Sequence, residues 1–331
     1  MKRIGVLCSG GDSPGMNACV RAVVRTGLGL GLEVFGVDRG YSGLVNGNLR
    51  PLASHDVSGI INHGGTMVRT ARCAEFREAA GRAQAAANCR ALGIEGLVVC
   101  GGDGSFSGAR EFWHEHGIGV AGTPGTIDND LAGTDYTIGF DTAVNTAVEA
   151  CDKIRDTADS HDRAFVVEVM GRASGSIALQ VAVAAGAEVV LLPERPEVGA
   201  QQAAQALVEA RAKGKTSMLV VVAEGAGSGA EVAKVIDEAV PELSVRASVL
   251  GYIQRGGSPT ANDRVLATMT GSGAVRALLE LGAACCHHIG VVAGCVTRTP
   301  LDVVVGQPKP LPHDLLELVG VSSGMHLPSL A

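Results

Sequence analysis

The sequence predicts an α/β fold with two doubly wound domains, each built on a mostly parallel sheet. Short apolar runs alternate with stretches of helical periodicity along the chain, which is the pattern of successive βαβ units. The runs at 97–99 and 218–223 are apolar at every position, as parallel strands buried on both faces are. Residues 6–12 and 98–104 also repeat one arrangement, an apolar run followed by glycines and an aspartate. Because ligands bind at the carboxyl ends of strands in such sheets, we expect both turns to face one crevice.

Each predicted strand is a short apolar run bounded by turn residues, and each predicted helix is a longer stretch. The predicted strands are residues 4–8, 34–37, 96–100, 119–122, 165–169, 189–192, 218–223, 244–250 and 289–293. The predicted helices are residues 16–29, 75–92, 142–157, 174–185, 200–212 and 263–281. The pattern loosens over 124–139 into a long loop. We therefore expect a first domain over residues 1–139, a second over 140–305, and a tail over 306–331 that packs back on the first domain.

Composition restricts the classes of protein to consider. The 331 residues are 46% hydrophobic, which is enough for substantial cores and excludes wholesale disorder. A net charge of −7 without a long basic run argues against nucleic acid as a partner. The apolar run at 4–8 is too short for a signal peptide and no run is long enough for a membrane span, so we expect a cytoplasmic protein. Nine cysteines without a CxxC pair indicate reduced thiols rather than a disulfide framework.

The run Cys285-Cys286-His287-His288 has the residue types of a metal site but not the spacing. Four contiguous residues do not easily converge on one tetrahedral ion, and no second ligand pair lies at a finger-like distance. We therefore expect two buried thiols and a surface histidine pair.

Two glycine-rich turns carry the first chemical signal. In the turn that ends at Asn17, glycines at 10, 11 and 15 would let backbone N–H groups approach an anion at the start of the next helix. The second turn, Gly101-Gly102-Asp103-Gly104-Ser105, adds a carboxylate that suits Mg²⁺. A tight structural turn and a helix N-cap explain the same residues without a ligand.

The loop Thr126-Ile127-Asp128-Asn129-Asp130 places two carboxylates and a hydroxyl within five residues. One aspartate can accept the proton of an attacking alcohol while the other organises the site, as phosphoryl transfer requires. Taken alone, Asx-turn chemistry accounts for the segment equally well.

Later segments contribute arginines at predicted strand ends and loops. Forked guanidinium groups in an acidic protein suggest a phosphorylated ligand, although a single arginine is more often a surface charge. Glu224 follows an apolar strand, where a carboxylate can receive sugar hydroxyls. The arginines are Arg163, Arg172, Arg246 and Arg255, and Arg72 in the first half is a further candidate.

Taken together and in this order, these segments resemble the bacterial ATP-dependent 6-phosphofructokinases (the phosphofructokinase A family) from Arg3 to Gly271. The resemblance implies two α/β domains with the active site between them, the first binding ATP and the second fructose 6-phosphate. It also implies a homotetramer whose active sites are completed by a neighbouring subunit.

The resemblance implies roles for individual residues. Asp128 is the base for the 1-hydroxyl of the sugar, Thr126 contacts the sugar beside it, and Arg172 stabilises charge on the transferring phosphoryl group. Arg163 and Arg246 reach in from a neighbouring subunit. ATP contacts fall on Gly11, Arg72, Cys73, Gly102, Asp103, Gly104 and Ser105, with Asp103 as the Mg²⁺ ligand. Sugar-phosphate contacts fall on Thr126, Asp128, Arg163, Met170, Gly171, Arg172, Glu224, Arg246, Tyr252 and Arg255.

Two glycines favour ATP as the donor. Pyrophosphate-dependent relatives typically carry Asp at the position of Gly104 and Lys at that of Gly125, and this chain has neither. Two residues depart from the family pattern. Tyr252 stands where histidine is usual, and a phenol cannot become cationic, so we expect weaker or less pH-dependent binding of the sugar phosphate. Cys73 replaces a bulkier residue beside Arg72, which loosens the expected adenine contacts.

Regulation and the alternatives stay open at this stage. Residues resembling an ADP or phosphoenolpyruvate effector site are Arg21, Arg25, Arg155, Glu188, Lys213 and Lys215, whereas Ser54 replaces an arginine usual in regulated members. The alternative functions are a pyrophosphate-dependent or mixed-donor phosphofructokinase and a non-catalytic sugar-phosphate sensor on the same fold. An NAD kinase would explain residues 101–104 but not 126–130 or 253–257.

Overall fold

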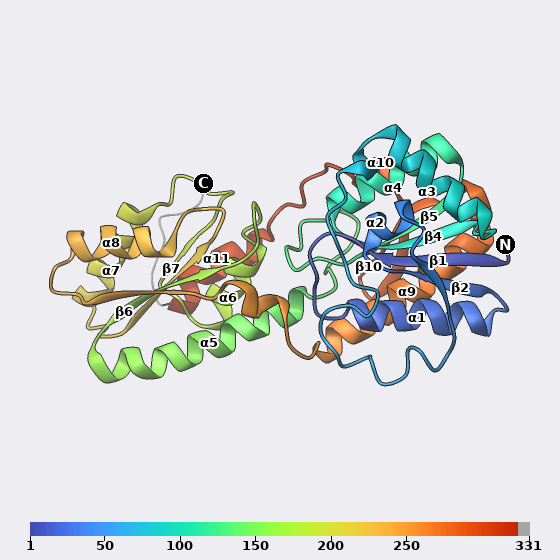
Figure 1. The fold of residues 1–331 in the computed structure, drawn as a ribbon. Coiled ribbons are helices and arrows are strands. Elements are labelled where there is room, and N and C mark those ends of the chain that lie inside the picture. Colours follow the sequence, from blue (N-terminus) through green and yellow to red (C-terminus); the bar gives the residue numbers. More distant parts are fainter. Residues whose placement is uncertain (324–331) are drawn as a thin grey trace. The chain divides into compact units, whose positions relative to one another are not determined.

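The computed structural model describes residues 1–323, and the chain divides into two compact units (Figure 1). The first unit comprises Met1–Thr142 and Arg255–Lys309, and the second comprises Ala143–Gln254 and the chain from Pro310 on. Helix α5 (Phe140–His161) begins in the first unit and continues in the second.

The first unit is built on a seven-stranded sheet with the order β11-β10-β5-β4-β1-β2-β3. The five strands from β10 to β2 run parallel, and the two edge strands β3 and β11 are antiparallel to their neighbours. The bounds are β1 Arg3–Cys8, β2 Glu33–Val37, β3 Leu49–Leu52, β4 Gly96–Gly101, β5 Gly119–Pro124, β10 Cys286–Val292 and β11 Cys295–Pro300.

Helices cover both faces of this sheet (Figure 1). On one face α1 (Met16–Gly29) and α9 (Ala261–Leu281) pack against each other and bury an aliphatic core. The other face buries the aromatic core, which includes Phe76, Phe106 and Phe112. Its helices are α2 Gly40–Val45, α3 Ala79–Ala91, α4 Asp103–His116 and α10 Leu301–Val304, with the short η1 Glu75–Arg77.

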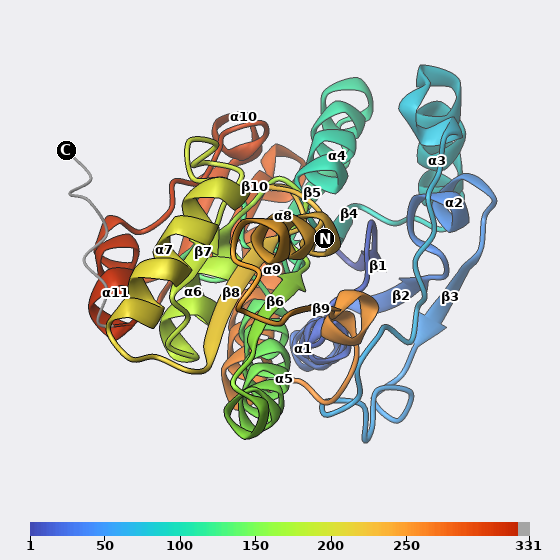
Figure 2. The ribbon, with the colours of Figure 1, turned by 90° about the vertical axis from the view of Figure 1, so that its left-hand side faces the viewer.

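The second unit has a four-stranded parallel sheet with the order β7-β8-β6-β9. Helices α7 and α8 pack together over one aliphatic core, while α6 and α11 contact each other and β7 (Figure 2). The bounds are β6 Ala164–Val169, α6 Ser176–Ala184, β7 Val189–Leu191, α7 Ala200–Ala212, β8 Met218–Ala223, α8 Gly229–Ala239, β9 Val245–Val249 and α11 His313–Ser323, with η2 Gly251–Arg255 and η3 Gly282–Ala284 elsewhere in the chain.

The predicted α/β class with mostly parallel sheets is confirmed, and every predicted strand and helix is present. Helix α1 and helix α7 have the predicted bounds, and the predicted helix at 75–92 is split into η1 and α3 at Glu78, whose backbone is extended. The elements not predicted include the two edge strands of the first sheet, two short helices and three helices of 11 to 14 residues. They are β3, β11, α2, α4, α8, α10 and α11.

The units differ in extent from the predicted domains. The predicted boundaries followed residues 139 and 305, whereas the structure divides the chain after Thr142, Gln254 and Lys309. Residues 255–309 join the first unit because β10 adds to the first sheet beside β5 and α9 packs on α1. Residues 310–323 belong to the second unit, where α11 packs on α6, and the last eight residues of the predicted tail lie outside the described residues.

The predicted surface histidine pair is wrong for His288, which is fully buried on β10. Its ring lies 5.4 Å from that of Phe106, and neither ring nitrogen makes a hydrogen bond to a described residue. Burial, with a smaller contribution from Lys309, lowers the pKa of His288 to about 4, so the ring is neutral at neutral pH. Cys285 and Cys286 are buried, as predicted.

Within residues 1–323, no helix combines the length and the apolar character that crossing a membrane requires.

Candidate active site

In the first unit, the candidate residues lie where neighbouring parallel strands end. Strands β1, β4 and β5 are adjacent, so their carboxyl ends meet at one edge of the sheet. The turn after β1 is tied to β4 because the N–H of Ser9 donates to the carbonyl of Cys100 at 2.9 Å. The turn after β4 is tied to β5 because the N–H of Gly125 donates to the carbonyl of Gly101 at 3.1 Å. The fold therefore brings three predicted segments together.

The turn after β1 contacts Arg255, which is distant in the sequence. Nη1 of Arg255 donates to the carbonyl of Asp12 at 3.0 Å. A Cβ at Gly11 would lie 2.3 Å from Nη1 of Arg255, so a larger residue there would displace the guanidinium group from its observed position. Gly10 has φ of 88°, a left-handed conformation that also favours glycine. The structure thus places Arg255, expected at the sugar phosphate, against the first glycine turn.

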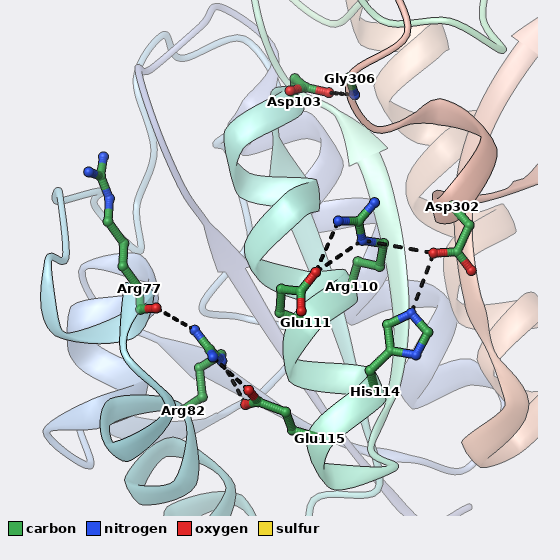
Figure 3. A network of polar contacts seen from close by, with 9 residues as sticks. All are labelled: Arg77, Arg82, Asp103, Arg110, Glu111, His114, Glu115, Asp302 and Gly306. Atoms are coloured by element: carbon green, nitrogen blue, oxygen red, sulfur yellow. Dashed lines mark hydrogen bonds and ion pairs between the residues drawn. The ribbon is translucent and has the colours of Figure 1, made fainter.

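Asp103 begins helix α4, at the carboxyl end of β4. Its Oδ1 accepts a hydrogen bond of 2.8 Å from the N–H of Gly306, as Figure 3 shows. The N-cap is Gly102, and no side-chain cap bond is present among the described residues, so the capping explanation for Asp103 does not hold. A half-buried carboxylate with one oxygen engaged fits Mg²⁺, which takes one or two carboxylates together with phosphate oxygens. The described residues contain no cluster of three His, Cys, Asp or Glu side chains that could hold a metal ion.

The loop after β5 buries its aspartate. Asp128 is 4% exposed, and its N–H donates to Oγ1 of Thr126 at 3.2 Å, a local turn of the kind that the side-chain chemistry predicts. Asn129 has φ of 50°, a conformation that Asn tolerates better than most residues. The loop lies beside the Asp103 turn, since a Cβ at Gly102 would be 3.6 Å from Cβ of Thr126. The two predicted acidic loops are therefore neighbours.

Helix α4 is anchored by charged groups on both sides (Figure 3). Arg82 on α3 forms a paired contact with Glu115 at 2.6 and 2.7 Å and also donates to the carbonyl of Arg77 at 2.6 Å. This contact raises the pKa of Arg82 and lowers that of Glu115. On the other side, Asp302 accepts from His114 at 3.4 Å. These pairs fix the helix whose first residue is Asp103.

Arg72 and Cys73 lie shortly before Phe76, one ring of a stacked aromatic pair. Arg72 is exposed, and Cys73 is half-buried against the aromatic core. The rings of Tyr41 and Phe76 stack with centroids 3.9 Å apart and an angle of 9° between the planes. Both rings are buried, so the stacked pair belongs to the core of the first unit, and the predicted effect of Cys73 on adenine contacts stays a prediction.

In the second unit, one carboxylate organises the turn after β6. Oε1 of Glu224 accepts from the N–H of Gly171 at 3.2 Å and of Arg172 at 2.7 Å. Arg172 has φ of 54°, and a Cβ at Gly171 would lie 2.5 Å from the carbonyl oxygen of Ser174. The N–H of Met170 donates to Oε1 of Gln254 at 2.9 Å. Glu224 thus holds the turn that presents Arg172, and its predicted contact with sugar hydroxyls stays a prediction.

Arg163 and Arg246 lie at the other end of this sheet. Arg163 immediately precedes β6, and Arg246 pairs in register with Phe165 on the neighbouring strand β9. The turn with Gly171 follows the carboxyl end of β6, about 20 Å away for a strand of this length. The structure therefore does not bring these two arginines together with Arg172.

Tyr252 is 82% exposed in the η2 segment.

Several candidate effector residues are already engaged within the chain. Glu188 is buried and accepts from Nζ of Lys215 at 2.8 Å and from the N–H of Leu219 at 2.6 Å. Arg155 donates to the carbonyls of Ala185 and Gly186 at 2.8 and 3.1 Å.

Two residues that lie outside the predicted motifs, Asp263 and Lys309, make hydrogen bonds to the segments of the site, and the sequence did not point to either. Oδ1 of Asp263 accepts from the N–H of Gly139 at 2.7 Å, and Oδ2 accepts from the N–H of Thr142 at 2.8 Å. Lys309 donates to Oδ1 of Asn129 at 2.9 Å. An acidic residue in the first turn of a helix and a lysine between two prolines carry no sequence signal for these contacts.

Comparison with known proteins agrees with this arrangement. The phosphofructokinase family model matches residues 3–278. The chain is 54% identical over 320 residues to the ATP-dependent 6-phosphofructokinase 1 of a Thermus thermophilus strain, covering 96% of this chain and 98% of that protein. It is 48% identical over 323 residues to the ATP-dependent 6-phosphofructokinase of Clostridium botulinum strain Hall, covering 98% of this chain and all of that protein.

Solved structures have the same fold. The phosphofructokinase of Saccharomyces cerevisiae matches with a TM-score of 0.86 at 39% identity over 98% of this chain, which spans about half (46%) of that longer chain. A pyrophosphate-dependent phosphofructokinase from Marinobacter aquaeolei matches with a TM-score of 0.83 over 100% of this chain and 94% of that chain, and at 20% identity it supports the fold alone. The motifs, the fold and these relatives agree, and the chain belongs to the phosphofructokinase family.

Proposed function

We propose that the chain transfers the γ-phosphoryl group of ATP to the 1-hydroxyl of fructose 6-phosphate, giving fructose 1,6-bisphosphate and ADP. The observation that carries this proposal is the placement of the buried Asp128 loop beside the Asp103 turn, at the shared carboxyl edge of β4 and β5. The relatives named ATP-dependent 6-phosphofructokinases support the substrates.

In this proposal, Asp128 accepts the proton of the attacking hydroxyl as the new P–O bond forms. Its burial removes competing water, and the bond from its N–H to Thr126 holds the backbone behind the carboxylate. Asp103, with its second oxygen, would hold Mg²⁺, which supplies positive charge to the phosphate oxygens of ATP when it is bound. The turn with Gly11, and the residues Gly102 and Gly104, would hold the nucleotide phosphates through backbone N–H groups. Ser105 would contribute its hydroxyl, because its N–H donates to the carbonyl of Gly102 at 2.9 Å.

The second unit would bind the sugar phosphate. Arg172, presented by the turn that Glu224 holds, would stabilise charge on the transferring phosphoryl group. Tyr252 and Met170 would contact the sugar phosphate, together with Arg255, which belongs to the first unit. The separation of Arg163 and Arg246 from that turn supports the proposal that they contact the sugar phosphate bound by a neighbouring subunit. The proposed assembly is a homotetramer, as the resemblance implies. We also propose a cytoplasmic location, as for a glycolytic enzyme.

The donor argument gains a structural detail. A Cβ at Gly104 would meet no heavy atom of a described residue within 4 Å, so the fold itself leaves room for a side chain there, and a carboxylate would instead be opposed by the phosphates of the nucleotide. Gly125 differs, since a Cβ there would lie 2.6 Å from Sγ of Cys100, and packing alone requires glycine. Gly104 is therefore the residue that favours ATP over pyrophosphate.

A coupled assay tests the proposal, with fructose 6-phosphate, Mg²⁺ and either ATP or pyrophosphate as donor. We expect turnover with ATP and at most a small fraction of it with pyrophosphate. No turnover with either donor would contradict the proposed reaction, and faster turnover with pyrophosphate would overturn the donor assignment. Omission of Mg²⁺ in the presence of a chelator should abolish turnover.

Effector binding is a separate proposal that concerns ADP and phosphoenolpyruvate. The internal pairing of Glu188 with Lys215, and serine at position 54, favour weak control. Titration of each effector at subsaturating fructose 6-phosphate measures it. An unchanged apparent affinity for the sugar phosphate would contradict the proposal of effector control at this site.

A further inference from the structure

The segment after α10 crosses both acidic loops of the first unit. We define residues 306–309 as the strap. At one end the N–H of Gly306 donates to Oδ1 of Asp103 at 2.8 Å (Figure 3). In the middle Pro308 forms an antiparallel bridge with Leu131, directly after the Asp128 loop. At the other end Nζ of Lys309 donates to Oδ1 of Asn129 at 2.9 Å and to the carbonyl of Asp135 at 2.6 Å.

Lys309 is an unusual lysine for a surface segment. It is half-buried, and burial lowers its pKa to about 8, although Asp135 and Asp130 act in the opposite direction. An ammonium group has three donors and no acceptor, so a partly desolvated lysine needs oxygen partners. The amide of Asn129 and the carbonyl of Asp135 supply them.

Asn129 needs such a contact because its backbone conformation is uncommon. Its φ of 50° is tolerated by asparagine but persists only where the surroundings determine it. Asn129 directly follows Asp128, so a rotation at Asn129 would tilt the peptide that carries the buried carboxylate. The lysine contact holds the side chain of Asn129 in the observed orientation.

We propose that Lys309 is a positioning residue of the phosphoryl-transfer site. Its hydrogen bond to Asn129 maintains the position of the Asp128 carboxylate relative to Asp103. The strap is the shared support, because one short segment contacts the turn with Asp103 and the loop with Asp128. The inference rests on the proposed function, since it concerns the geometry of that reaction. Lys309 itself touches neither substrate nor metal in this account.

The test is a double-mutant cycle between Lys309→Met, which removes the donor and keeps the length, and Asn129→Gly, which removes the acceptor and keeps the left-handed backbone accessible. We expect Lys309→Met to lower kcat by about 10- to 100-fold, the usual consequence of a misplacement near 1 Å. The KM for ATP should change by less than about threefold, since the nucleotide loops are untouched. The double variant should be no worse than the poorer single variant.

Two measurements keep the outcomes distinct. Lys153→Met, which removes an exposed lysine paired with Glu149, is the matched control and should retain wild-type kcat. Thermal unfolding of every variant is measured in parallel. A wild-type kcat for Lys309→Met, or losses of kcat that multiply in the double variant, would overturn the inference. So would a loss that appears only as a lower melting temperature with kcat per folded enzyme unchanged. Failure of the proposed function would instead appear as a wild-type chain without turnover.

Discussion

In the first unit the candidate aspartates lie in turns that other segments contact, whereas in the second unit two of the candidate arginines, Arg172 and Arg246, are exposed. Asp128 is buried, and Asp103 accepts a backbone hydrogen bond from a distant segment. In the second unit, the carboxylate of Glu224 accepts a hydrogen bond from the backbone N–H of Arg172.

The difference follows from what each region has to do. A base and a metal ligand act over short distances, so their positions must exist before the substrate arrives. A guanidinium group that binds a phosphate can instead be ordered by its ligand, at a cost in side-chain entropy. We therefore expect substitutions of the base and the metal ligand in the first unit to reduce kcat, and substitutions of the sugar-phosphate contacts in the second unit to raise the KM for the sugar phosphate. Arg172 is the exception, because a group that acts on the transferring phosphoryl group affects kcat.

The largest expected effect is that of Asp128→Ser. Removal of the base should lower kcat by about two to four powers of ten, the usual worth of a positioned base, while sugar binding survives. Steady-state kinetics with fructose 6-phosphate and ATP measures both quantities. A fall in sugar affinity alone would show that Asp128 is a binding residue. It would also contradict the expectation that substitutions of the first unit's aspartates act on kcat.

Gly104→Asp should have the next largest effect. The added carboxylate fits the fold but opposes the nucleotide phosphates, and like charges in contact cost several kcal/mol, so kcat/KM for ATP should fall about 100-fold. Gly104→Ala is the matched control and should retain most ATP turnover, because its Cβ meets no atom. Equal losses in both variants would indicate a steric effect and remove the donor argument.

Glu224→Ala tests whether the turn after β6 in the second unit acts on sugar binding rather than on kcat. Loss of the carboxylate leaves the N–H groups of Gly171 and Arg172 without their acceptor, so the KM for fructose 6-phosphate should rise about tenfold. Glu224→Gln keeps a carbonyl acceptor and should restore part of the affinity. If kcat fell and the KM for fructose 6-phosphate stayed constant, the turn would act on the chemical step, as the aspartates of the first unit are proposed to do, rather than on sugar binding.

The smallest expected effect concerns the pH dependence of stability through Asp263. Burial raises its pKa to about 6 from 3.8, despite the hydrogen bonds it accepts from Thr142 and Gly139. A raised pKa means that the native state binds the proton more tightly, so the contribution of Asp263 to stability is largest below about pH 4 and falls as pH rises through 6.

Asp263→Asn removes this titration. The difference in unfolding free energy between wild type and variant should shrink by about 1 kcal/mol from pH 5 to pH 7.5. Denaturant unfolding at the two pH values measures it. A difference that grows with pH would mean that the hydrogen bonds, rather than burial, dominate the pKa of Asp263.

Local sequence was sufficient to predict the parallel strands and the turns that follow them. Strands such as β4 and β8 are continuous apolar runs, and this pattern depends only on burial of both faces. The aspartates of the two acidic loops were found because each lies next to such a strand or to glycines. Strands β3 and β11 were missed because edge strands have a partner on one side and need little apolar character.

The sequence by itself therefore determined the α/β class, the family and the acidic loops, because these depend on periodicity and on short contiguous motifs. Only the tertiary structure decided that Arg255 lies against Gly11, that Gly306 and Lys309 contact the two acidic loops, and that His288 is buried. It also decided that residues 255–309 belong to the first unit. The physical reason is that these contacts join segments separated by more than one hundred residues, and no local pattern records which distant oxygen a lysine or a backbone N–H will find.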